Sequence, residues 1–164
     1  MSNYSKLMKS FKNGVYHIEA FELSDLSQFG SYPNLMKEKY EKGFTQIIIN
    51  SFLMIGIMEY LSKHEKWVLT GMEISDPSVD EETLMQIKTI FHKIRGNRND
   101  FSLLKEYLFW ALDEGSIFID QISAYNLKES INIEINSNGL LYGNNNKIIL
   151  DSVILPLLNR YLNE

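Results

Sequence analysis

The sequence of 164 residues has no cysteine, only three prolines, and nine glycines that are scattered along the chain. The absence of cysteine excludes disulfide bonds, thiolate nucleophiles, cysteine-ligated zinc and iron–sulfur clusters. The scattered glycines leave no Gly-rich loop of the kind that cradles a phosphate. We therefore expect a protein of the reducing cytoplasm.

The sequence also lacks an export signal and a plausible membrane span. The first twelve residues contain no continuous apolar core of the kind that a secretion signal has. The longest apolar block, residues 44–61, is interrupted by polar side chains and has charged residues on both sides, which makes it a poor membrane span. These polar residues are Gln46, Asn50, Ser51 and Glu59. We expect a cytoplasmic protein with no membrane partner.

The composition is that of a globular protein, with 45% hydrophobic, 23% charged and 12% aromatic residues. The length fits a single globular domain, residues 1–164, which folds as a monomer or dimer. The formal net charge is −5 and the isoelectric point is near 5.3. This charge argues against nucleic-acid binding and favours a neutral or basic protein partner.

Residues 44–62 form the apolar stretch around which we expect the fold to be organised. The stretch is too long for one strand, and its apolar side chains cover almost the whole circumference of a helix. Such a helix needs packing partners on several sides. The sequence therefore predicts a mainly α fold, in which helices pack around a central buried helix at about residues 44–62, with a small β-hairpin near the C-terminus.

Other helices are predicted from apolar residues at three- and four-residue spacings and from capping residues. They are expected at residues 3–12, at 34–42 after Pro33, at 79–95 with Ser78 and Glu81 as a capping box, at 101–112 after Asn99 or Asp100, and from Asp151 or Ser152 to Leu162. Residues 116–122 either continue the helix before them or begin a further helical turn.

Extended structure is predicted in three places. Residues 15–23 alternate imperfectly between apolar and polar, and residues 67–74 form a short extended segment after a turn. Residues 131–135 alternate strictly and are followed by Asn138 and Gly139, a dipeptide typical of a hairpin turn. Residues 140–142 supply the return strand.

The three histidines, His17, His64 and His92, are far apart and have no partner at the i, i+4 spacing of a helical metal site. No spacing in the sequence indicates a catalytic triad, because such triads are assembled from distant residues. We predict no metal, no other cofactor and no enzymatic activity.

The segment 87–100 carries the most concentrated basic face in the sequence, made of Lys88, His92, Lys93, Arg95 and Arg98. Its Arg98-Asn99 pair resembles the start of the Arg-polar-x-x-x-His motif of HEPN ribonucleases. Ser102 or Leu103 stands where that family carries histidine, so the resemblance implies a degenerate RNase or antitoxin without the catalytic base. The alternative is that the basic residues complement the dipole at a helix C-terminus.

Acidic residues form two groups, and we treat all eight as candidate partner-binding residues. The first group is Glu73, Asp76, Asp80, Glu81 and Glu82, and the second is Asp113, Glu114 and Asp120. Carboxylates are favourable at a helix N-terminus, so solvation of helix ends is one interpretation. The other is that they face a basic partner, where they take the place of phosphates and steer association.

The acidic stretch Ser75-Asp-Pro-Ser-Val-Asp-Glu-Glu82 lies in a small, cysteine-free domain without a catalytic motif. In this overall character the chain resembles the immunity proteins of bacterial contact-dependent growth inhibition and related polymorphic-toxin systems. The resemblance implies an inhibitor that binds one cognate toxin domain, often a nuclease with a basic cleft, and occludes its active site. Three other classes stay open: the degenerate HEPN-like RNase or antitoxin, a small ligand-binding regulator, and a structural subunit of an assembly.

Overall fold

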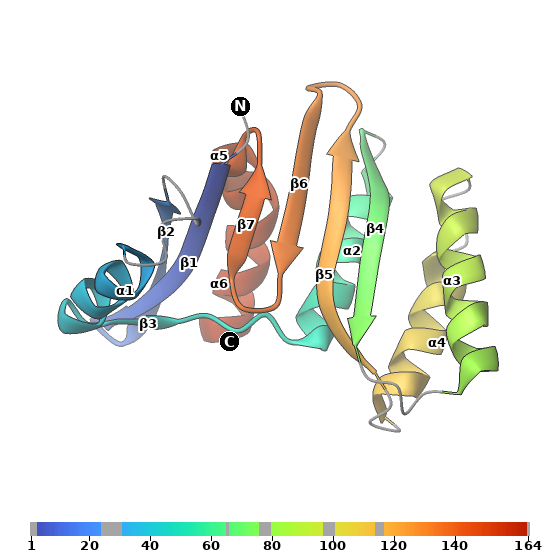
Figure 1. Cartoon of the computed structure of the whole chain (residues 1–164), viewed down its shortest axis with the longest axis horizontal. Helices are drawn as coiled ribbons and strands as arrows, with labels where there is room; N and C mark the ends of the chain where they lie inside the picture. Colours follow the sequence, from blue (N-terminus) through green and yellow to red (C-terminus); the bar gives the residue numbers. More distant parts are fainter. Residues whose placement is uncertain are drawn as a thin grey trace. The chain divides into compact units, whose positions relative to one another are not determined.

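The computed structural model describes residues 3–23, 31–64, 66–75, 80–96, 101–113 and 117–163 (Figure 1). These residues form an α+β fold, so the prediction of a mainly α protein with a small β-hairpin near the C-terminus is wrong. The elements are β1 (Asn3–Lys12), β2 (Val15–Leu23), α1 (Ser31–Glu41), β3 (Phe44–Gln46), α2 (Ser51–Lys63), β4 (Trp67–Ser75), α3 (Glu81–Gly96), α4 (Phe101–Asp113), β5 (Phe118–Asn126), β6 (Ile131–Asn136), β7 (Leu140–Gly143), α5 (Asn146–Ile149), a π-helical segment (Leu150–Ile154) and α6 (Leu155–Asn163).

The chain divides into two compact units. One unit contains both ends of the chain, Met1–Ile49 and Ile131–Glu164, and is called the terminal unit below. The other, Asn50–Ser130, is called the middle unit.

In the terminal unit, β1 is the strand that organises the sheet. It pairs antiparallel with β2 along nine residues, from Tyr4 opposite Leu23 to Lys12 opposite Val15. Its other edge is shared, because the first part pairs with β7 and the later part with β3. Met8 of β1 packs with Met36 of α1 and Phe44 of β3 in a small apolar cluster. Helix α1 therefore covers part of this sheet.

The prediction of a helix at residues 3–12 is wrong because β1 is buried on both faces. Four consecutive residues from Ser5 to Met8 are buried. Met8 faces the cluster with α1, whereas Ser5 receives a hydrogen bond from the side chain of Asn146 at the start of α5, with an N–O distance of 3.1 Å. A strand covered on both sides shows no alternation of apolar and polar residues, and here its apolar residues fall at helical spacings.

In the middle unit, β4 and β5 pair antiparallel, and α2 packs against both strands. Helices α3 and α4 pack against each other, and α3 also contacts β4 (Figure 1). The β4–β5 ladder is irregular at two points, where Thr70 in β4 and Asp120 in β5 are extra residues.

The central helix predicted at residues 44–62 begins later than expected. Phe44–Gln46 form β3, and α2 begins after Asn50, whose side-chain oxygen accepts a hydrogen bond from the Leu53 N–H at 2.9 Å. The β-branched residues before this cap favour extended backbone. Nor is α2 enclosed all round, because the side chain of Phe52 is 52% exposed.

The helical interpretation of residues 116–122 is also wrong, since residues 118–122 belong to β5, and residue 116 lies outside the described residues. The bulge at Asp120 explains the error. Ile119 and Ile122 are both buried although three residues separate them, because the extra residue changes the parity of the strand. A bulged strand thus showed the i, i+3 spacing of a helix.

Several other predictions are confirmed. The strands at 15–23, 67–74 and 131–135 are present, and Gly139 occupies the hairpin turn with a positive φ of 84°. The predicted last helix begins earlier, after Asn145, and continues through the π-helical segment into α6. Among the described helices, none combines the length and the apolar character that crossing a bilayer requires.

Candidate functional site

Helix α3 begins at a carboxylate cap. Asp80 accepts hydrogen bonds from the backbone N–H of Thr83 at 2.7 Å and from its hydroxyl at 2.8 Å. These bonds, the backbone one first, lower the pKa of the Asp80 carboxyl. Ser78, the expected cap, lies outside the described residues. The Asp80 carboxylate therefore serves as the N-terminal cap of α3.

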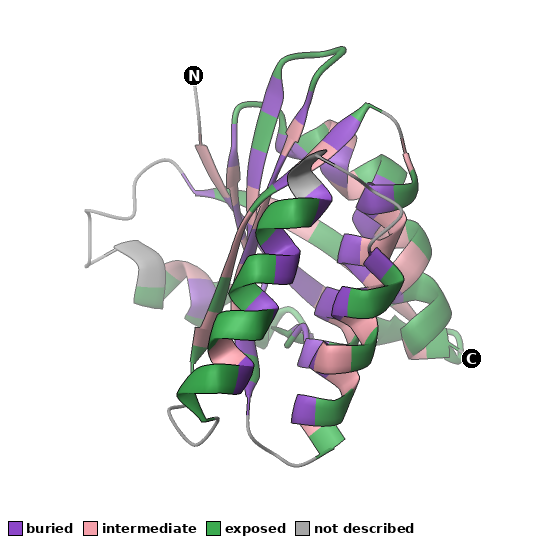
Figure 2. Cartoon of the chain, turned by 90° about the vertical axis from the view of Figure 1, so that its right-hand side faces the viewer, coloured by how far each residue is buried: buried purple, intermediate pink, exposed green. Residues whose placement is uncertain are grey.

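The sides of α3 and α4 that face the interior carry apolar residues at helical spacing. The buried residues of α3 are Thr83, Ile87, Ile90, Phe91 and Ile94, and those of α4 are Phe101, Leu104, Leu108 and Ala111. Figure 2, which looks onto these two helices, shows buried and exposed residues alternating along both. Burial of this stripe fixes which side chains point outward.

The outward side of the two helices carries large apolar residues that remain exposed. Met85 is 70% exposed, Leu103 45% and Trp110 52%, and Tyr107 between the latter two is half-buried. We call Met85, Leu103, Tyr107 and Trp110 the α3–α4 patch. Two open hollows of about 390 and 360 Å³ lie here and share Gln86, Leu103 and Tyr107 as lining residues.

Charged residues border the α3–α4 patch. Glu106 lines one hollow, and Glu82 and Lys93 line the other. Glu81 is exposed beside Glu82 in the first turn of α3. The surroundings of the patch are therefore mainly acidic.

The structure brings only part of the predicted acidic set to this surface. Glu81 and Glu82 lie beside the patch, and Asp80 caps the helix that carries them. The others lie elsewhere or are not described: Glu73 is exposed on β4, Asp113 ends α4, Asp120 is the half-buried bulge residue of β5, and Asp76 and Glu114 lie outside the described residues.

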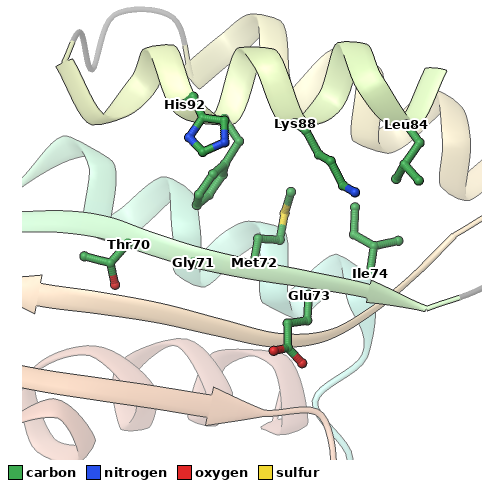
Figure 3. Close-up of a pocket in the computed structure, with 9 residues that line it drawn as sticks. Thr70, Gly71, Met72, Glu73, Ile74, Leu84, Lys88 and His92 are labelled. Atoms are coloured by element: carbon green, nitrogen blue, oxygen red, sulfur yellow. The ribbon is translucent and has the colours of Figure 1, made fainter. Parts of the chain in front are cut away.

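Another hollow, of about 510 Å³, lies between β4 and α3 (Figure 3). Figure 3 shows Met72 and Ile74 extending from β4 toward α3, whereas Glu73 extends from the other side of the strand. Lys88 and His92, both from the predicted basic face, project from α3 into this space. The strand supplies five consecutive lining residues, from Thr70 to Ile74.

Of the remaining basic residues, the structure describes only the side chain of Lys93. Lys93 faces the α3–α4 side, and the side chain of Arg95 is outside the description, as are Arg98 and Asn99. The HEPN-like pair is therefore not placed by the structure. Ser102 is exposed in α4.

A further hollow, of about 690 Å³, lies between α2 and α4 and contains an ion-pair network. Glu59 accepts hydrogen bonds from Lys105 at 2.8 Å and from Lys63 at 2.9 Å. These bonds, that of Lys105 first, lower the pKa of Glu59. Within the described part of the chain, no three His, Asp or Glu side chains gather in a group that suits a metal ion.

Comparisons with known protein families, with curated proteins and with solved structures found no match to this chain. We therefore infer function from the geometry of the middle unit. The α3–α4 patch was missed in the sequence, although a signal for it was present. The apolar residues of α4 form two stripes, one with Leu104 and Leu108 and one with Leu103, Tyr107 and Trp110, and a helix has only one stripe to bury against a single core.

Proposed function

We propose that this protein is an inhibitor of the immunity type, which binds a cognate bacterial toxin domain through the α3–α4 patch. The supporting observation is the exposed group of Met85, Leu103, Tyr107 and Trp110 at two adjoining hollows. Methionine and aromatic residues are enriched at the centres of protein interfaces, and tryptophan and tyrosine are common among residues that dominate binding energy. A surface of this composition suits a protein partner.

The charge of the surroundings favours a basic partner. Glu81, Glu82 and Glu106 lie beside the patch, and the whole chain has a net charge of −5. Carboxylates around an apolar centre attract a basic cleft, such as the phosphate-binding site of a nuclease, and raise the association rate. In the proposed complex the apolar residues hold the toxin, and the carboxylates cover its cleft.

The test uses the toxin domain encoded beside the gene for this chain and separates the two roles kinetically. Reversing Glu81, Glu82 and Glu106 together to Lys should lower the association rate constant by about tenfold and reduce its salt dependence. Trp110→Ala should instead raise the dissociation rate constant, by about 30-fold if Trp110 contributes about 2 kcal/mol. Surface plasmon resonance measures both constants.

The control is Glu73→Lys with Glu129→Lys, which makes acidic-to-basic changes at exposed residues outside α3 and α4. This control should bind the toxin nearly as well as the wild type. Asp80 is left unchanged in all variants, because its loss would weaken the start of α3. The proposal is wrong if the neighbouring gene encodes no toxin, or if the control weakens binding as much as the patch variants do.

A further inference from the structure

The edge of β4 has features of a second binding site. In the order of paired strands β4 stands at one end, so β5 pairs with one of its edges and no described strand pairs with the other. Figure 1 shows α3 beyond that other edge, and the hollow between them is the one drawn in Figure 3. We call this hollow the β4–α3 groove.

We propose that the β4–α3 groove binds a five-residue extended segment of a partner protein, which adds to the edge of β4 as a further strand. The segment carries apolar side chains at its first and fifth positions and a carboxylate at its third. This inference uses residues other than the α3–α4 patch and does not depend on the toxin-binding proposal.

The backbone of β4 supplies the first argument. An edge strand directs alternate N–H and C=O groups away from its neighbour, and an added strand satisfies them. Between the two bulges, Gly71–Glu73 pair regularly with Gln121–Ser123 of β5. This regular stretch lies at the centre of the run that lines the groove.

The length of the groove supplies the second argument. Four residue steps separate Thr70 from Ile74, which corresponds to about 13 Å of strand. Leu84 and His92 on α3 are eight residues apart, which corresponds to about 12 Å of helix. The two walls match in length, and a segment of five extended residues spans both.

The chemistry of the helical wall defines the side chains of the segment. Leu84, Lys88 and Phe91 line the groove in that order along α3, at intervals of about 6 and 4.5 Å. Alternate side chains of a strand are about 6.6 Å apart, so positions one, three and five of the segment face these three residues. Met72 and Ile74, which Figure 3 shows directed toward α3, add to the apolar lining.

The ammonium group of Lys88 is the reason for a carboxylate at the third position of the segment. The side chain is exposed in the groove and makes no ion pair or hydrogen bond with any described residue. Glu73, the acidic residue among the described residues that line the groove, extends from the other side of β4 (Figure 3). An aspartate in the middle of the segment pairs with this ammonium group.

The probe is a set of sixteen fluorescein-labelled, end-blocked pentapeptides. Positions two and four are Thr, position three is Asp, and positions one and five are each Val, Ile, Leu or Phe. Fluorescence anisotropy with the full chain should show saturable binding of at least one peptide. Lys88→Glu should weaken that binding by about two- to fivefold, and the same peptide with Lys at position three should recover it on Lys88→Glu. Lys93→Glu, on the same helix but lining the α3–α4 side, is the matched control and should change little.

Backbone methylation separates strand addition from adhesion to an apolar surface. Because only alternate N–H groups of an added strand face β4, N-methylation at positions two and four and N-methylation at positions one, three and five should differ in effect. One pattern should weaken binding by about tenfold or more through lost hydrogen bonds, and the other should retain most of it. The proposal is wrong if no peptide binds, if both N-methylation patterns weaken binding equally, or if Lys93→Glu weakens binding as much as Lys88→Glu. In that case α3 only shields the edge of β4.

Discussion

The ammonium group of Lys6 in β1 donates a hydrogen bond to the backbone carbonyl of Asn138 in the turn between β6 and β7. Two backbone bonds hold the residues on either side of Asn138. The N–H of Leu7 donates to the carbonyl of Gly139 at 2.9 Å, and the N–H of Ile49 donates to that of Ser137 at 2.7 Å. The hairpin tip is thus fixed by residues far from it in sequence.

Lys6→Met is expected to leave the free energy of unfolding at pH 7 unchanged or to raise it. Lys6 is almost fully buried, and burial lowers the pKa of its ammonium group. Desolvating a cation costs several kcal/mol, more than the roughly 1.5–3 kcal/mol of one charged hydrogen bond, and methionine has a similar length. Urea unfolding of both proteins measures the difference.

The same comparison has a definite pH dependence. Because the pKa of Lys6 is lowered on folding, the unfolded state binds more protons between the folded value and the ordinary value of about 10.4. Wild-type stability should therefore rise relative to Lys6→Met as the pH increases toward that value. A variant that is strongly destabilised at every pH would mean that the contact with Asn138 outweighs the cost of burial.

Gly139→Ala is expected to destabilise the protein by roughly 2 kcal/mol or more. Gly139 has a positive φ, which costs about 1 kcal/mol for a residue with a Cβ. A Cβ there would also lie 2.9 Å from the carbonyl oxygen of Ile47 and 3.3 Å from that of Leu7. Gly14→Ala is the matched control, since Gly14 has a φ of 80° with nothing within 4 Å of the added carbon. If thermal melts show equal losses for both variants, the close approach at Gly139 does not matter.

The elements that could be predicted from sequence are those whose pattern depends on one buried face. The hairpin around Gly139 alternates because β6 has one buried and one more exposed side, and α3 has its apolar stripe for the same reason. Burial of β1 on both faces and the bulge at Asp120 in β5 removed that alternation. Both depend on contacts between segments distant in sequence, which local periodicity cannot report.

The candidate site was predictable to a smaller extent. Glu81 and Glu82 were identified because acidic residues at a helix start form a local pattern. The two apolar stripes of α4 indicate that one of them stays exposed, but the packing of α3 against α4 decides which one, so Trp110 and Met85 were not assigned to the surface. The β4–α3 groove could not be predicted without the strand order, which places β4 at an edge.

Ile55→Asp in α2 is expected to unfold the protein. The side chain of Ile55 is 1% exposed, and an unpaired carboxylate there costs several kcal/mol, comparable with the roughly 5–15 kcal/mol of a whole domain. Phe52→Asp, one turn earlier in the same helix and facing outward, is the control. It loses the ring contact with Phe109, about 0.5–1.5 kcal/mol, and the apolar area of a half-exposed ring, and should keep a cooperative transition. Circular dichroism melts distinguish them, and a normal transition for Ile55→Asp would contradict the burial of α2.

Glu59→Gln is expected to remove part of the acid sensitivity of the fold. The hydrogen bonds from Lys105 and Lys63 lower the pKa of Glu59, so between the folded value and the ordinary value of about 4.3 the unfolded state binds more protons. The resulting stability is fully present above about pH 4.3 and is lost as the pH falls through the folded value. At pH 7 the variant should be less stable by at most about 1 kcal/mol, because the Glu59 side chain is 26% exposed and salt screens it.

Urea unfolding in a pH series measures this difference, which should shrink in acid and also at high salt. Glu106→Gln is the matched control, because Glu106 lies beside Lys105 in α4 but makes no ion pair with a described residue. The difference in stability between the Glu106→Gln variant and the wild type should stay nearly constant with pH. A Glu59→Gln difference that does not change between neutral and acidic pH would mean that the network contributes through packing of the Lys105 and Lys63 side chains rather than through the charge of Glu59.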